Sequence, residues 1–111
     1  MTKIGEGKGV PEEDPVQKAH KDIEYNALRF LNALESFKGS NYEDRARLKG
    51  VMDDSMKMIR GAVSEIRQSG IYNQEVKVEK DYKAFIQSST PENSSALEED
   101  IGLLRDFNRL G

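Results

Sequence analysis

Apolar residues recur at steps of three and four positions between residues 16 and 37. The series comprises Val16, Ala19, Ile23, Ala27, Phe30, Leu31, Leu34 and Phe37. At about 100° per residue, these side chains fall in one stripe on the side of a helix. Asp14 is a good N-cap, Pro15 suits the first turn, and Gly39 suits a C-terminal position with positive φ. The pattern therefore predicts a helix over residues 14–39.

A second apolar stripe follows after a short polar turn. Its members are Leu48, Met52, Ile59, Ala62 and Ile66, broadened by Val51, Met58 and Val63. Ser40 and Glu43 have the spacing of a capping box, and Gly70 is a helix stop signal. The pattern predicts a second helix that ends near residue 69. Because the turn around Gly39 is short, the two helices are expected to form a long antiparallel hairpin over residues 14–70.

Gly50 and Gly61 lie inside this second helix. Each costs roughly 1 kcal/mol relative to alanine. Two explanations stay open: another helix approaches closely at these positions, or the protein tolerates a locally weaker helix.

The pattern after Gly70 is ambiguous. Tyr72, Val76 and Val78 alternate as in a strand, whereas Val78, Tyr82 and Phe85 are spaced as in a helix. A single strand without a partner would be unstable, so we predict a helix over 73–88.

Residues 88–94 have the composition of a loop, with three serines, a threonine and a proline. Ser95 and Glu98 then have the spacing of another capping box. They are predicted to open a last helix over 95–110, with one apolar face made by Leu97, Ile101, Leu104 and Phe107.

Residues 1–13 contain three glycines, a proline and alternating charges, and are predicted to be a flexible tail. The fold class predicted for the rest is all-α. We expect a single domain over 14–111, in which the hairpin and two shorter helices form a small bundle.

Composition narrows the possible functions. The 111 residues carry a net charge of −3, and no apolar run approaches the roughly 20 residues that cross a bilayer. The N-terminus has no hydrophobic stretch of the kind found in signal peptides. These features predict a soluble protein without a membrane span. A cytoplasmic location is expected, and the alternative is export without a cleavable signal peptide.

Catalytic and metal-binding patterns are not evident. The chain has no cysteine, which excludes disulfides, thiol catalysis and cysteine-ligated zinc. His20 is the single histidine; it lies at the edge of an apolar face and is interpreted as a packing residue. The acidic clusters lack the spacing of a calcium loop. We therefore predict a protein that is not an enzyme, with no metal, no cofactor and no indicated small-molecule ligand.

The candidate partner-binding residues are basic or apolar side chains outside the apolar stripes given above. Arg45, Lys49, Arg60 and Arg67 form a basic ridge along the edge of the second stripe. Two interpretations stay open: the ridge meets an acidic partner, or its long stems flank the core and pair with the chain's own acids, of which Glu98–Asp100 are candidates. The remaining candidates are Met56 within the ridge, Tyr25 and Leu28 off the first stripe, and Tyr42 at the turn. For Met56, packing in the core is the favoured alternative, because methionine fills ordinary cores more often than binding grooves.

The hairpin resembles a family of small secreted helical-hairpin proteins whose turn is marked by Trp-x-Gly. Here Phe37-Lys38-Gly39 occupies that place, with Phe in the position of Trp. Type III secretion needle subunits are hairpins of similar size. The resemblance covers residues 15–70 and implies a secreted or filament-forming protein of a specialised secretion system.

We expect a non-enzymatic protein–protein interaction module, such as an adaptor, a small subunit or a chaperone-like protein. Its amphipathic helices would bind another protein or a second copy of the chain. The secreted or filament-forming hairpin is the alternative. A nucleic-acid binder that uses Arg45, Lys49 and Arg60 is a weaker alternative, because the net charge is negative.

Overall fold

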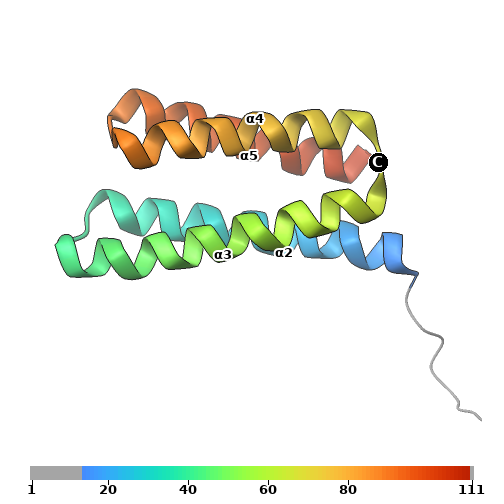
Figure 1. Ribbon diagram of the computed structural model, residues 1–111, viewed down its shortest axis with the longest axis horizontal. Coiled ribbons are helices and arrows are strands. Elements are labelled where there is room, and N and C mark those ends of the chain that lie inside the picture. Colours follow the sequence, from blue (N-terminus) through green and yellow to red (C-terminus); the bar gives the residue numbers. More distant parts are fainter. Residues whose placement is uncertain (1–13, 111) are drawn as a thin grey trace, which may run out of the picture.

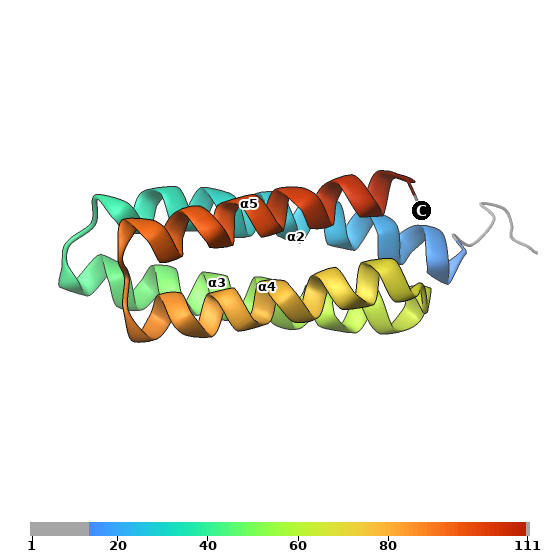
Figure 2. The ribbon, with the colours of Figure 1, turned by 90° about the horizontal axis from the view of Figure 1, so that it is seen from above.

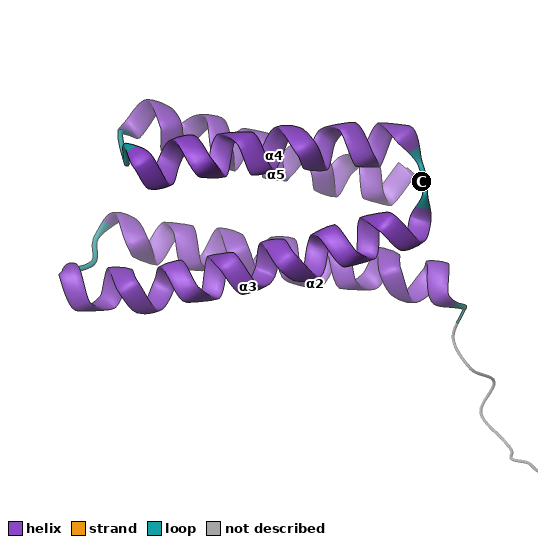
Figure 3. Cartoon of the chain, viewed as in Figure 1, coloured by secondary structure: helices purple, strands orange, loops and turns teal. Residues whose placement is uncertain are grey.

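The computed structural model describes residues 14–110, so the tail predicted over 1–13 lies outside the described residues. This part of the chain forms four helices and no strand, and Figures 1 and 3 show their arrangement. Their bounds are α2 (Pro15–Lys38), α3 (Tyr42–Ile66), α4 (Ser69–Gln87) and α5 (Pro91–Leu110). The predicted fold class is confirmed: this is a small all-α bundle, with a long hairpin and two shorter helices.

The four helices form a ring in which each packs on two neighbours. Contacts join α2 to α3, α3 to α4, α4 to α5, and α5 back to α2. Figures 1 and 2 show that consecutive helices are antiparallel, with the α2–α3 hairpin in one layer and α4–α5 in the other. The diagonal pair α2 and α4 meets only through side chains, as in the edge-to-face contacts Phe30–Tyr82 and Phe37–Phe85, each with 5.3 Å between ring centroids. None of the described helices combines the length and apolar character needed to cross a membrane.

The start and the end of α2 are as predicted, but the backbone conformation at Gly39 is not. The Asp14 carboxylate accepts a hydrogen bond from the Val16 backbone N–H at 2.9 Å. Gly39, however, has φ −108°, so the expected positive φ at this glycine is wrong. The Phe37 carbonyl instead accepts hydrogen bonds from the backbone N–H and the hydroxyl of Ser40. Because side-chain capping satisfies this carbonyl, the left-handed turn is not needed.

The bounds of α3 also differ from the prediction. Its N-cap is Asn41, which accepts a hydrogen bond from the Asp44 backbone N–H, because the predicted cap Ser40 is engaged with α2. The helix ends at Ile66, where Arg67 adopts the left-handed conformation with φ 60°. Gly70 is therefore not a stop signal; it lies in the first turn of α4.

Both shorter helices begin earlier than predicted. Residues 72–78 are helical, since α4 starts at Ser69 rather than at 73. The start of α5 is Pro91, not Ser95, because the Thr90 hydroxyl accepts a hydrogen bond from the Asn93 backbone N–H. Proline at the first position and threonine at the cap are both favoured at a helix start.

All four helices contribute to one core, although three positions differ from the predicted stripes. Its largest fully buried apolar residues are Phe30, Phe85, Ile23, Leu34, Met52, Ile59, Ile71, Leu97, Ile101, Leu104 and Val78. Val16, Met58 and Phe107 were expected in the apolar stripes but are 39%, 48% and 42% exposed. Met56, for which packing in the core is the alternative to a binding role, is 2% exposed and belongs to the core. Met56 is buried because α3 packs on α4 as well as on α2.

Polar contacts join the first helix to the last. The Glu24 carboxylate accepts hydrogen bonds from Arg105 at 2.5 Å and from Arg109 at 3.0 Å. His20 Nδ1 lies 2.7 Å from the Asn108 side-chain oxygen, and the Asn108 amide donates to the His20 carbonyl at 2.9 Å. His20 therefore lies at a helix–helix contact, where its ring is held by Asn108.

Candidate interaction groove between α3 and α4

Three of the predicted partner-binding residues line one groove, which runs between α3 and α4. They are Lys49, Met56 and Arg60, and the groove has a volume of about 550 Å³. In Figure 1 the two helices that form it are those nearest the viewer. The structure thus brings together residues that the sequence placed along only one helix.

The groove has an apolar floor and a charged rim. Met56, Tyr82 and Ile86 supply the apolar surface. Four cationic and two anionic side chains surround it: Lys49, Lys57, Arg60, Lys83, Asp53 and Glu79. The rim is therefore positive overall on a protein whose net charge is −3.

Two exposed apolar residues extend this surface along α4. Tyr72 is 56% exposed and Val76 is 45% exposed. Together with Glu79, Lys83 and Ile86 they follow one another at steps of four and three residues, which places all five on one side of the helix. We call the groove residues with Tyr72 and Val76 the α3–α4 surface.

An ion pair closes the rim at one end of the groove. Arg60 makes a two-point contact with Glu79, in which Arg60 Nε donates to one carboxylate oxygen at 3.1 Å and Arg60 Nη2 donates to the other. The contact lowers the pKa of Glu79 and raises the pKa of Arg60. It ties α3 to α4 across the groove.

Glu75 lies beneath this ion pair, one turn before Glu79, and is 2% exposed. Burial, together with the hydrogen bond and the charge of Glu79, raises the pKa of Glu75 to about 8. At neutral pH the Glu75 carboxyl is therefore mainly protonated, and it can donate to the Glu79 carboxylate.

The other end of the groove is fixed by Asp53. Its carboxylate accepts hydrogen bonds from the Tyr82 hydroxyl at 2.5 Å and from Lys49 Nζ at 2.9 Å. Burial acts to raise the pKa of Asp53, but these two hydrogen bonds outweigh it and lower the pKa. The ring of Tyr82 is thereby fixed as part of the groove floor.

The four residues of the basic ridge do not share one environment in the structure. Lys49 and Arg60 pair with Asp53 and Glu79, so part of the ridge binds the chain's own acids. The suggested partners Glu98–Asp100 are not the ones used, because Lys38 binds Glu98 and Lys77 lies 3.7 Å from Asp100. Lys57 and Lys83, which the sequence analysis did not select, are in no ion pair within residues 14–110.

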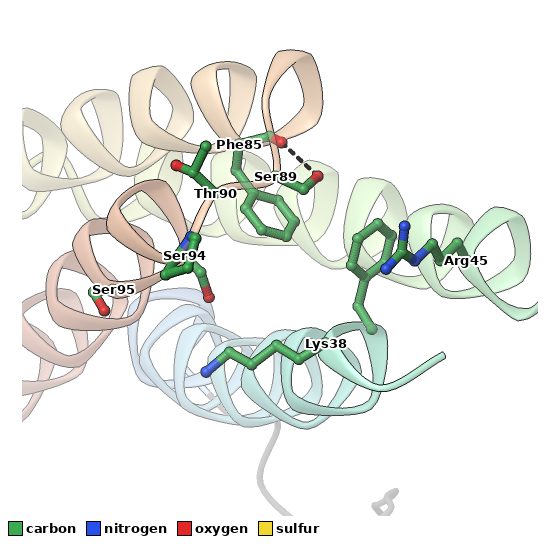
Figure 4. A pocket seen from close by; sticks show the side chains of 9 residues that line it. Lys38, Arg45, Phe85, Ser89, Thr90, Ser94 and Ser95 are labelled. Carbon is green, nitrogen blue, oxygen red and sulfur yellow. Dashed lines mark hydrogen bonds between the residues drawn. The ribbon is translucent and has the colours of Figure 1, made fainter. Parts of the chain in front are cut away.

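A second hollow, of about 300 Å³, lies where the α2–α3 turn meets the α4–α5 loop. Figure 4 shows Lys38 and Arg45 on its rim, with Phe85 and Ser89 on the opposite side. Both cations are already engaged: Lys38 contacts Glu35 and Glu98, and the Arg45 guanidinium lies 5.2 Å from the Phe37 ring centroid. This hollow is therefore a weaker candidate for an anionic partner than the α3–α4 surface.

The remaining predicted residues are separate from the groove. Tyr25 and Leu28 lie on α2 and are 67% and 41% exposed. Tyr42 is 88% exposed at the start of α3, and Arg67 forms the cap between α3 and α4. The eight candidates thus do not form one continuous site.

Sequence reasoning missed most of the α3–α4 surface, because it selected only Lys49, Met56 and Arg60. The missed residues are Asp53, Lys57, Tyr72, Val76, Glu79, Tyr82, Lys83, Ile86 and Gln87. Tyr72 and Val76 were considered only as part of a strand-like alternation and not as members of an apolar helix face, although their spacing of four residues is helical. Recognising two apolar stripes on this segment, one buried and one exposed, would have identified them.

Within residues 14–110, no group of three or more histidine, aspartate or glutamate residues is arranged to hold a metal ion. Comparison with protein-family models, curated proteins and solved structures found no match to this chain.

Proposed function

We propose that this protein is a non-enzymatic interaction module whose α3–α4 surface binds an acidic, amphipathic helix. The observation that supports the proposal is the combination of an apolar floor and a cationic rim in one groove. A helix that lies in such a groove buries its apolar side chains on the floor and directs its acids to the rim.

The floor offers the kind of side chains that dominate binding energy. Half-buried Ile86 lies in the groove above the mostly buried Tyr82 and Met56, and exposed Tyr72 enlarges the apolar area. Aromatic residues and methionine are enriched at the centres of interfaces, while charged rims set orientation and association rate. Lys57 and Lys83 suit the second role because their ammonium groups are not held in ion pairs among the described residues.

A designed peptide tests this proposal on the full chain. The peptide has about 20 residues, so that it can be helical, with Leu and Phe on one face and Glu beside them. Binding is measured by fluorescence anisotropy. We expect Lys83→Glu to weaken binding by roughly threefold to tenfold, and added salt to weaken it further.

Lys80→Glu is the matched control, because Lys80 is also an exposed lysine of α4 but does not line the groove. It should leave the affinity close to that of the wild type. Equal losses for both variants would contradict the proposal. So would equal binding of a peptide with Lys in place of Glu, or tighter binding of a single-stranded oligonucleotide.

A further inference from the structure

The outer face of α5 carries a seven-residue repeat that the bundle does not use. Acidic residues occur at steps of seven: Glu92, Glu99 and Asp106. Four positions after each acid stands an apolar residue: Ala96, Leu103 and Leu110. All six side chains are exposed, and Phe107 adds a further apolar side chain that is 42% exposed. We call these seven residues the α5 outer face.

A repeat of this kind is typical of a helix that packs on other helices along two faces. The buried face of α5 already contains Leu97, Ile101 and Leu104, which pack inside the bundle. Steps of four and three over three turns or more form a straight seam that suits a further helix–helix contact. The acids form a row beside the apolar residues, as in the charged flank of such a seam.

The α3–α4 surface has the matching pattern and the opposite charge. Its residues also follow at steps of four and three, in the series 49, 53, 56 and 60 on α3 and 72, 76, 79, 83 and 86 on α4. Its rim is positive overall, whereas the three ionisable groups of the α5 outer face are all acidic. At 1.5 Å per residue the α4 series spans about 21 Å and the α5 series about 27 Å, so the lengths are compatible.

We propose that the α5 outer face of one copy of this chain docks on the α3–α4 surface of a second copy. This inference rests on the proposed function and identifies the acidic, amphipathic helix as α5. Leu103, Phe107 and Leu110 would cover the apolar floor, and Glu99 and Asp106 would face Lys57 and Lys83.

The two surfaces lie on different sides of the bundle. In Figure 1, α3 and α4 are nearest the viewer, whereas α5 lies behind α4, and Figure 2 shows the same arrangement from above. When one groove binds one α5 outer face, each copy of the pair is therefore left with one unoccupied surface. Such head-to-tail contacts build open chains or closed rings rather than only dimers.

Sedimentation velocity over a concentration series tests the inference on the full chain. The wild type should show an average mass that rises with concentration up to about 1 mM and falls as salt is added. A groove variant (Lys57→Glu with Lys83→Glu) and a face variant (Glu99→Lys with Asp106→Lys) should each be monomeric. All four positions are exposed and in no ion pair within residues 14–110, so both variants should keep the helical circular dichroism of the wild type.

Mixing the two variants is the decisive measurement. The groove variant keeps an intact α5 outer face, and the face variant keeps an intact groove. The mixture should therefore associate again, because the intact groove pairs with the intact α5 outer face and the two reversed surfaces are also opposite in charge. A mixture that stays monomeric, or variants that associate as the wild type does, would overturn the inference.

The designed peptide separates this inference from the proposed function. A wild type that is monomeric at every concentration but binds the peptide would overturn self-association. The partner of the groove would then be a different protein. A monomeric wild type that does not bind the peptide would overturn both.

Discussion

Met56 and Met58 lie two residues apart on α3 but have different surroundings. Met56 is 2% exposed, packs in the core and lines the groove floor. Met58 is 48% exposed on the opposite flank, beside α2. A methionine side chain therefore stabilises the core at position 56, whereas at position 58 it buries little apolar surface.

Alanine substitutions should separate the two methionines. We expect Met56→Ala to lower the free energy of unfolding by about 2–4 kcal/mol, because it removes buried apolar surface and leaves a cavity. The matched control Met58→Ala should change it by less than about 0.5 kcal/mol. Urea denaturation of both variants gives the comparison, and equal effects would contradict the assigned burial.

At the scale of the helices, glycines and caps are not optimised for stability. A Cβ built at Gly50 or Gly61 would have no atom within 4 Å apart from the helix's own nearby backbone. This favours a tolerated weakness over a close helix approach as the explanation for these glycines. Arg67, in turn, occupies a left-handed conformation that glycine adopts at less cost.

These positions predict stabilising substitutions. Gly50→Ala and Gly61→Ala should each raise the free energy of unfolding by about 0.5–1 kcal/mol, because alanine favours the helix. Arg67→Gly should raise it by up to about 1 kcal/mol through relief of the left-handed strain. Gly39→Ala is the control: since φ at Gly39 is negative, alanine should be tolerated there. Thermal denaturation measures all four, and a large loss in Gly39→Ala would contradict the observed turn.

At the scale of the whole molecule, buried and paired carboxyls set two opposing pH trends. Ion pairs and hydrogen bonds lower the pKa values of Glu24, Asp53 and Glu79, so the stability that these groups contribute is lost as the pH falls. Burial and neighbouring acids raise the pKa of Glu75 to about 8 and of Asp81 to about 6. For these two groups the folded state holds the proton more tightly, so stability falls as the pH rises.

Glu75→Gln should remove the larger of the two losses of stability that occur as the pH rises. In the wild type, the contribution of Glu75 is lost between its unfolded pKa of 4.5 and its folded pKa of about 8. Gln cannot ionise and can still donate to Glu79, so the variant should be more stable at pH 8 by roughly 2 kcal/mol or more. Urea denaturation from pH 5 to pH 8.5 measures this. A variant with the same pH slope as the wild type would show that Glu75 is not the group responsible.

The sequence by itself determined the helices and most of their buried stripes. Helical periodicity is a local property, so residues such as Ile23, Phe30 and Ile59 could be assigned to the core without a fold. The cap at Asp14 was predictable for the same reason, because the capping side chain and its backbone donor are two residues apart. Other predicted helix boundaries are wrong where two neighbouring polar residues could both act as the cap, as Ser40 and Asn41 could.

Only the tertiary structure decided which flank of each stripe is covered by a second neighbour. The packing of α4 against one flank of α3 buries Met56, pairs Arg60 with Glu79 and raises the pKa of Glu75. It also decided that Tyr72 and Val76 remain exposed beside the groove. The physical reason is that periodicity gives the direction of a helix's apolar face, whereas the position of a second packed helix depends on contacts between residues far apart in the chain.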